Sequence, residues 1–343
     1  MSDVTLAITI LWMFIFVYSI LGSIDFGSGY WALVFGKGMN TKAGDIANRF
    51  LSPTWKVTNV FLVLLVVALV GFFPKATFTL GTLLVLPVCL ALVLLTIRST
   101  FMVYAYSVHR FSRMLSIVSG ITGLLIPALL VSVLPITLGG FVTMEAGTPV
   151  LAFGKLLQSP TEYAHLGFGL ATELFLSALF LADYAREAQD EMTYRIYRQM
   201  VIILGPLTLV MAVLTTVAMT PEAQWIVANF KQQWLWFTLS AVSFIIGYIA
   251  MWIPGKHDKV GYPRIAMVAV ILQYALASYA YGASHLPYML YPYLTVEQGF
   301  TNHAMFRSLL IGYIVSSAVL IPVFIWFWKL FLKDKRYLNP ESE

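Results

Sequence analysis

Long apolar runs separated by short polar connections dominate the chain. Within a run the residues are apolar on every side rather than at alternate positions, as in 62–70. A membrane-spanning strand would alternate apolar and polar residues, whereas a helix in lipid can be apolar all round. One bilayer crossing needs about 20 residues. The pattern therefore predicts nine membrane-spanning helices, at about 6–31, 56–73, 77–98, 115–137, 162–184, 200–219, 233–253, 263–283 and 307–331.

The composition agrees with a chain that lies almost entirely in a membrane. Of its 343 residues, 59% are hydrophobic and 11% are charged, and the mean hydropathy is +0.82. A soluble domain of this length needs more polar surface. No connection is long enough for a soluble domain, so we expect an all-α integral membrane protein with one transmembrane domain over 1–343. The first run lacks a basic start and a small-residue cleavage site, which predicts a retained helix rather than a signal peptide.

The basic residues are divided unequally between the two sets of connections. Lys and Arg collect in the cytoplasmic connections of membrane proteins. With the N-terminus outside, 17 of the 21 basic residues lie on the inner side, and only Lys75, Lys155, Lys231 and Arg307 lie on the outer side. The predicted orientation is therefore N-terminus outside and C-terminus in the cytoplasm. This division accounts for the formal charge of +5 without a nucleic-acid partner.

Three connections have a distinct character. On the predicted outer side, 138–161 and 284–306 contain the Gly and Pro residues typical of packed surface loops. On the inner side, 186–199 carries charges of both signs, among them Glu191 and Arg195. Opposite charges three or four residues apart stabilise a helix. We therefore expect this stretch to extend the fifth helix.

Asp25 is the only charged residue of the first apolar run. A carboxylate inside hydrocarbon costs a few kcal/mol, so it should face protein or water. At helical spacing, Gly22, Ser28 and Gly29 share its face. Small residues on that face would let a neighbouring backbone come close to the acid. The alternative is a polar helix end whose side chain reaches the membrane surface.

Further polar residues lie in or beside the predicted helices. Lys56, Thr58 and Asn59 open the second helix, and Arg98 ends the third. Lys56, Arg98 and Asp183, at the inner end of the fifth helix, could simply extend to the interface. Glu173, near the middle of that helix, suggests a proton or ion route. It could equally be a neutral acid that a neighbouring helix satisfies.

The residues offer little for binding a cofactor or a metal. Haem in membrane helices is held by histidines well inside the bilayer. Here four histidines fall in connections and His165 falls at the outer rim of the fifth helix. The only cysteine, Cys89, has no partner for a disulfide or a cluster. The glycines near Asp25 lack a phosphate-loop pattern. We therefore expect no haem, metal or nucleotide on this chain, and no catalytic residues.

Several motifs resemble subunit II of the cytochrome bd-type quinol oxidases. Asp25-Phe26-Gly27-Ser28-Gly29 is similar to that family's first-helix signature. The segments 53–60 and 71–74 are similar to its second-helix region, and Arg98 falls where the family has an arginine closing the third helix. The end of the chain also fits, from Leu286-Pro287-Tyr288 through 320–323 to 326–329. The resemblance thus covers nearly the whole chain.

This resemblance implies a haem-free partner of a haem-bearing subunit I in the bacterial cytoplasmic membrane. Each subunit of the family has nine transmembrane helices, mostly as two four-helix bundles with one peripheral helix. The complex oxidises quinol on the outer side and reduces dioxygen to water with cytoplasmic protons. Haems b and d and the quinol site belong to subunit I, which this chain would stabilise. The resemblance does not say whether small accessory membrane subunits attach.

The resemblance also places Asp25 on a cytoplasmic proton route along the subunit interface. The family commonly has an acidic residue just after the Trp of the second helix, where this chain has Lys56. We expect Lys56 to pair with Asp25 and hold it ionised, with Thr58 and Asn59 beside them. A different class, a secondary transporter that uses Asp25 and Glu173, is the main alternative. Its usual inverted repeats and broken helices are not evident in the sequence.

Overall fold

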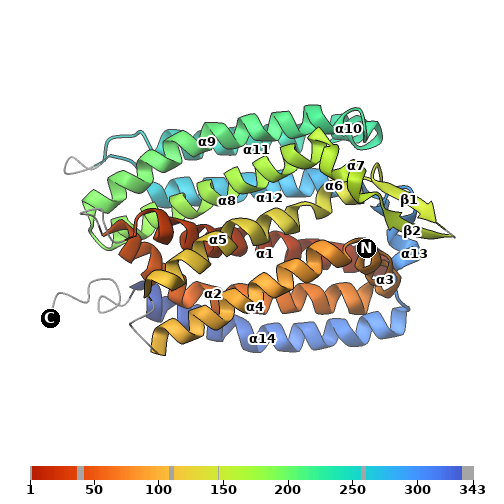
Figure 1. Ribbon diagram of the computed structural model, residues 1–343, viewed down its shortest axis with the longest axis horizontal. Helices are drawn as coiled ribbons and strands as arrows, with labels where there is room; N and C mark the ends of the chain where they lie inside the picture. Colours follow the sequence, from red (N-terminus) through yellow and green to blue (C-terminus); the bar gives the residue numbers. More distant parts are fainter. Residues whose placement is uncertain (1, 37–41, 108–111, 146, 256–259, 334–343) are drawn as a thin grey trace.

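The computed structural model describes residues 2–36, 42–107, 112–145, 147–255 and 260–333. Long helices lie side by side along the longest axis of the molecule (Figure 1). Within the described residues, nine helices are long and apolar enough to cross a membrane. The predicted all-α membrane fold is therefore confirmed.

Helices make up most of the described chain, and four short strands join them. In chain order the elements are α1 (Asp3–Val34), α2 (Ala43–Phe72), α3 (Pro74–Leu83), α4 (Val85–Ser107), α5 (Ser112–Val131), α6 (Val133–Thr137), β1 (Val142–Glu145), β2 (Thr148–Leu151), α7 (Phe153–Gln158), α8 (Pro160–Glu187), α9 (Glu191–Met219), α10 (Gln224–Phe230), η2 (Lys231–Gln233), α11 (Trp234–Ala250), α12 (Pro263–His285), β3 (Tyr288–Leu290), β4 (Leu294–Thr295), α13 (Val296–Gly299) and α14 (His303–Lys333).

The ends of several helices differ from the sequence-based prediction. Helix α4 continues to Ser107, nine residues beyond the predicted end of the third span. The stretch 186–199 does not extend the fifth helix, because α8 ends at Glu187. A turn follows in which Gln189 has a φ of 59°, and the Asp190 side chain accepts a hydrogen bond from the backbone N–H of Thr193. This cap starts α9, so the expected extension was wrong.

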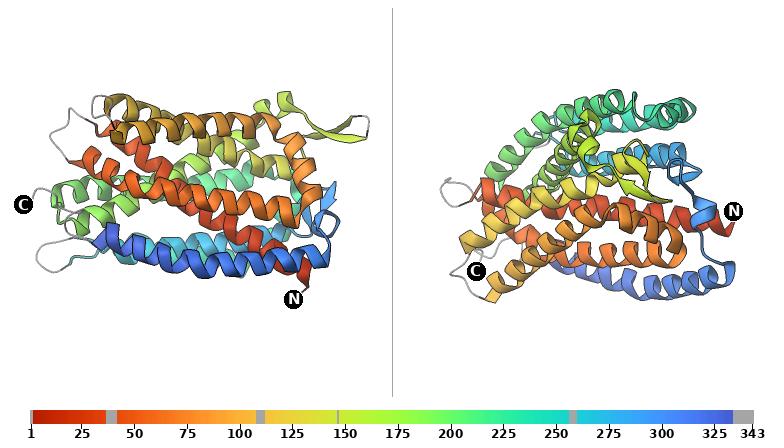
Figure 2. Two further views of the ribbon diagram at one scale, coloured as in Figure 1. Left: turned by 90° about the horizontal axis from the view of Figure 1, so that it is seen from below. Right: turned by 45° about the vertical axis from the view of Figure 1, so that its right-hand side comes forward.

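The two ends of the molecule differ in structure and charge. One end, called here the hairpin end, contains the start of α1 and the antiparallel pairs β1–β2 and β3–β4 (Figure 2). The loops expected at 138–161 and 284–306 are thus partly hairpins. The opposite end, called the basic end, contains the junctions of α8 with α9 and of α11 with α12. The described basic residues at or near it are Lys42, Arg113, Arg186, Arg195, Arg198 and Arg264, whereas Lys75, Lys155, Lys231 and Arg307 lie at the hairpin end.

The long helices form two sets that meet at α1. In the first set, α1 packs on α2 and α5, and α5 packs on α4. In the second set, α8 packs on α9 and α12, and α12 packs on α11. The contact of α1 with α8 joins the sets, and α14 lies against α2. The expected division into two four-helix bundles and one peripheral helix is compatible with these contacts and stays a prediction.

A glycine fixes the packing at the hairpin end. Gly139 has a φ of 87°, and a Cβ at this position would collide with the backbone carbonyl of Tyr291, in the loop between β3 and β4. Gly147, in the β1–β2 turn, has a similar φ of 82° but open space around it. A side chain at 139 would therefore cause both backbone strain and a clash, whereas one at 147 would cause strain alone.

We expect Gly139→Ala to destabilise the purified protein more than Gly147→Ala does. The left-handed conformation costs an L-residue about 1–2 kcal/mol at either position, and the clash with Tyr291 adds to this at 139 only. Thermal unfolding in detergent would measure the difference between the two variants. Equal unfolding temperatures would contradict the close approach of the two loops.

Candidate functional site

Asp25 lies inside the protein on α1, with 3% of its surface exposed. It is nine residues before the end of α1 at Val34, which places it about 13 Å from the basic end of the helix. The neighbouring small residues bring α1 and α5 together, as the sequence predicted. A Cβ on Gly29 would lie 2.8 Å from the carbonyl oxygen of Ser119, and one on Gly123 would lie 2.5 Å from that of Phe26.

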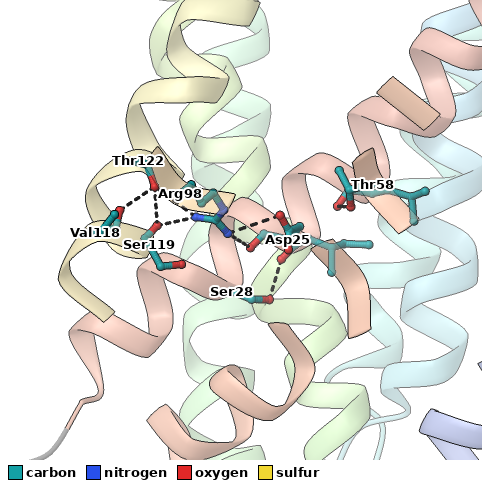
Figure 3. Close-up of polar contacts among 9 residues, drawn as sticks. Asp25, Ser28, Thr58, Arg98, Val118, Ser119 and Thr122 are labelled. Carbon is teal, nitrogen blue, oxygen red and sulfur yellow. Dashed lines mark hydrogen bonds and ion pairs between the residues drawn. The ribbon is translucent and has the colours of Figure 1, made fainter. Parts of the chain in front are cut away.

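Arg98 is the ion-pair partner that the structure gives Asp25. Its Nη2 lies 3.4 Å from Asp25 Oδ2 and donates to the Asp25 carbonyl oxygen at 3.0 Å. Its Nη1 donates to the carbonyl oxygen of Ser119 at 2.7 Å. The guanidinium, 5.1 Å from the Phe26 ring centre, therefore connects α1, α4 and α5 (Figure 3). With 3% exposure it does not extend to the membrane surface. Because α4 is longer than predicted, Arg98 lies well inside the helix.

The expected pairing of Asp25 with Lys56 was wrong. Lys56 is exposed on α2, and no ion pair joins it to Asp25 among the described residues. The same helix does approach the site through Thr58, which is 2% exposed and donates to the carbonyl oxygen of Leu21 at 3.5 Å. Asn59 is half-buried beside it. The structure thus brings Asp25, Arg98 and Thr58 together and leaves Lys56 at the surface.

Glu173 is fully buried near the middle of α8, with 0% exposure. It belongs to the second helix set and lies at the contact with α1, where Gly27 is next to its backbone carbonyl. Neither of its carboxylate oxygens has a hydrogen-bond partner among the described residues. The expectation of a neighbouring helix that satisfies this acid is therefore not met by any described side chain.

Other buried acids have clear structural partners. Asp183, 8% exposed, accepts from Arg264 Nε at 2.8 Å, so α8 and α12 are tied at the basic end. The Asp183 side chain is therefore held in an ion pair and does not extend to the membrane interface, which the sequence had left open. At the hairpin end, Glu162 accepts a short hydrogen bond from the Ser132 hydroxyl. Sequence reasoning missed Glu162 because it lies at the predicted edge of a span, where an acid is unremarkable.

The three described histidines each make a polar contact with a nearby group. His165 and His285 direct Nδ1 at the carbonyl oxygens of Thr161 and Tyr288, and His303 contacts Asp3. All three lie toward the hairpin end rather than in the middle of the helices. His109 and His257 lie outside the described residues. Across 2–36, 42–107, 112–145, 147–255 and 260–333, no group of three or more His, Cys, Asp or Glu side chains could hold a metal ion.

Fold and site together define a class of protein. Its described part is a helical membrane protein with nine candidate spans, which buries a carboxylate–guanidinium pair and a separate carboxyl between its helices. Residues 4–331 match the family model for cytochrome bd terminal oxidase subunit II. The chain therefore belongs to this family, and the resemblance noted in its motifs is confirmed.

Two relatives extend over essentially the whole chain. A Bacillus subtilis (strain 168) protein described as a putative cytochrome bd menaquinol oxidase subunit II is 46% identical over 343 residues, which is 99% of each chain. The structure of bd oxidase from Geobacillus thermodenitrificans contains a similar chain, with a TM-score of 0.81 and 34% identity. That match covers 98% of this chain and 100% of the other.

We expect Arg98→Met to destabilise the protein strongly. Removing one partner of a buried ion pair costs about 3–5 kcal/mol, because a charge is left in a site of low polarity. The double variant Asp25→Asn/Arg98→Met should recover part of this loss, since both charges leave together. Lys56→Met is the control and should unfold like the parent protein. Thermal unfolding in detergent would test this, and an Arg98→Met variant as stable as the control would refute the pair.

Proposed function

We propose that this chain is the haem-free subunit II of a bd-type quinol oxidase and that it stabilises a haem-bearing subunit I. Family membership makes it a component of an oxidase complex. The positions of the described histidines, near one end of the helices, support the assignment of haems b and d to the partner. On this proposal the chain contributes no catalytic residue, and quinol and dioxygen are substrates of the complex. Because the Bacillus relative is described as a putative menaquinol oxidase subunit, menaquinol is the first quinol to test as a substrate.

We also propose that Asp25 lies on a cytoplasmic proton route at the interface with subunit I. The observation that carries this proposal is a carboxylate buried about 13 Å from the basic end and held by Arg98. Thr58 links α2 to α1 one turn before Asp25. Lys56 and Asn59 lie beside it on the exposed edge of α2, which we propose faces the partner. The route then passes between the subunits, with water and these polar groups carrying protons inward.

The charge distribution supports an orientation with the N-terminus outside. The described basic residues collect at one end of the helices, and cytoplasmic ends attract such residues. The basic end is then cytoplasmic, and Asp25 lies nearer to the side that supplies protons than to the outer side. Family membership favours this function over the secondary transporter that the buried carboxylates alone left open.

We expect Asp25→Asn to slow quinol-driven oxygen consumption while haem content stays normal. Loss of a positioned proton-transfer group costs on the order of 10²-fold when it limits the rate. Asp183→Asn, the same change at a structural ion pair outside the proposed route, is the matched control. Oxygen electrode traces and haem absorption of each assembled variant give the two readouts. Unchanged oxygen consumption in Asp25→Asn with full haem would rule out an important role for Asp25.

We expect haem absorption only when this chain is purified together with its partner subunit. Gentle purification of this chain from a cell that makes the complex should bring a haem-bearing membrane protein with it. The chain produced alone should show the absorption of its aromatic residues without a haem band. A haem band in the isolated chain would refute the haem-free assignment, and co-purification would then test the partnership separately.

A further inference from the structure

Glu173 is the buried acid that the proposed route does not use. The other buried acids, Asp25, Glu162 and Asp183, each accept from a described side chain. Glu173 has no such donor among the described residues, although its burial is complete. An ionised carboxyl in such a site costs several kcal/mol unless it is paired. The groups around Glu173 therefore decide whether its carboxyl is ionised or neutral.

Glu173 lies beside the Asp25–Arg98 pair at the contact between the two helix sets. Gly27, two residues after Asp25, lies directly against α8, and a Cβ on it would be 3.0 Å from the Glu173 carbonyl oxygen. One turn further, the Trp31 indole donates to the Ser177 hydroxyl at 2.9 Å. Asp25, two residues before Gly27, and its partner Arg98 therefore lie near this part of α8.

The direction of the helices brings the two carboxyls to the same level. Both α1 and α8 begin at the hairpin end and run toward the basic end (Figure 1). A helical side chain points back toward the start of its helix. The Glu173 side chain therefore extends from the level of Gly27 toward that of Asp25. Tyr18, two turns before Asp25 on α1, has a buried hydroxyl without a hydrogen-bond partner among the described residues.

The charges in this region do not balance if both acids are ionised. Among the described side chains, one guanidinium faces two carboxyls, and its hydrogen bonds go to Asp25, Ser119 and Thr122. Arg98 therefore compensates the charge of Asp25, and the Glu173 carboxyl is expected to be neutral. We propose that Glu173 is a second protonatable site of this subunit, which holds a proton as the neutral acid and exchanges it with Asp25 across the α1–α8 contact.

The protonated carboxyl can be observed directly in the assembled oxidase by infrared difference spectroscopy. A neutral acid has a C=O stretching band that shifts in heavy water, whereas a carboxylate lacks it. We expect the oxidised-minus-reduced spectrum of the parent to contain such a band and Glu173→Gln to lose it. Glu162→Gln, the same change at a partnered acid on the same helix, is the matched control and should keep it.

Coupling to Asp25 gives a second, independent readout. Asp25→Asn removes the neighbouring negative charge, so the Glu173 band should shift in frequency. Glu173→Asp should keep a displaced band, and this variant serves if Glu173→Gln does not assemble. A band that survives in Glu173→Gln, a parent without a band, or a Glu173 band that ignores Asp25→Asn would each overturn the proposal.

This inference rests on the proposed function for the assembled oxidase in which the bands are measured, and it does not depend on whether Asp25 limits the rate of proton transfer. If Asp25→Asn consumes oxygen normally, the proton route fails, yet the infrared bands still report whether Glu173 is protonated and coupled to Asp25. If the route holds but the band survives in Glu173→Gln, only the second site fails. The two experiments therefore separate the two proposals.

Discussion

The structure depends on one buried cation. Arg98 extends from α4 into an apolar interior, where an unsatisfied guanidinium would be too costly. Its two terminal nitrogens find acceptors because α1 and α5 present Asp25 and the Ser119 carbonyl to them. That requires the two helices to be almost in contact, and glycines on both of them permit it. A Cβ on Gly29 would already lie 3.0 Å from Arg98 Nη1. The charge of Arg98 can therefore be compensated only if α1 and α5 pack closely together.

The second helix set is attached to this centre through α8. Gly27 removes the side chain that would separate α8 from α1, and the Trp31–Ser177 hydrogen bond fixes their register. Glu173 consequently lies beside the ion pair rather than in a separate part of the membrane. Two acids with different surroundings, one paired with a cation and one without a described partner, are a common means of giving carboxyl groups different tasks.

Much of the fold could be predicted because lipid permits few structures. Nine apolar runs predicted nine spans, and the single charges Asp25 and Glu173 stood out against them. The partner of Asp25 could not be found in the same way. Lys56 is near the start of a span, whereas Arg98 is 73 residues away in sequence and seemed to close its helix. The hairpins escaped prediction because their strands have two to four residues, too few to show a period.

The position of α1 has a mechanical consequence. In transporters that alternate access, one group of helices rocks against the other about a central site. Here such rocking would have to separate Gly27 from α8 and break the hydrogen bond from the Trp31 indole to the Ser177 hydroxyl. Trp31 and Ser177 are both buried, and neither contact includes a long side chain that could follow the movement. The contact of α1 with α8 therefore opposes rocking, and the two helix sets are held as one body within the membrane.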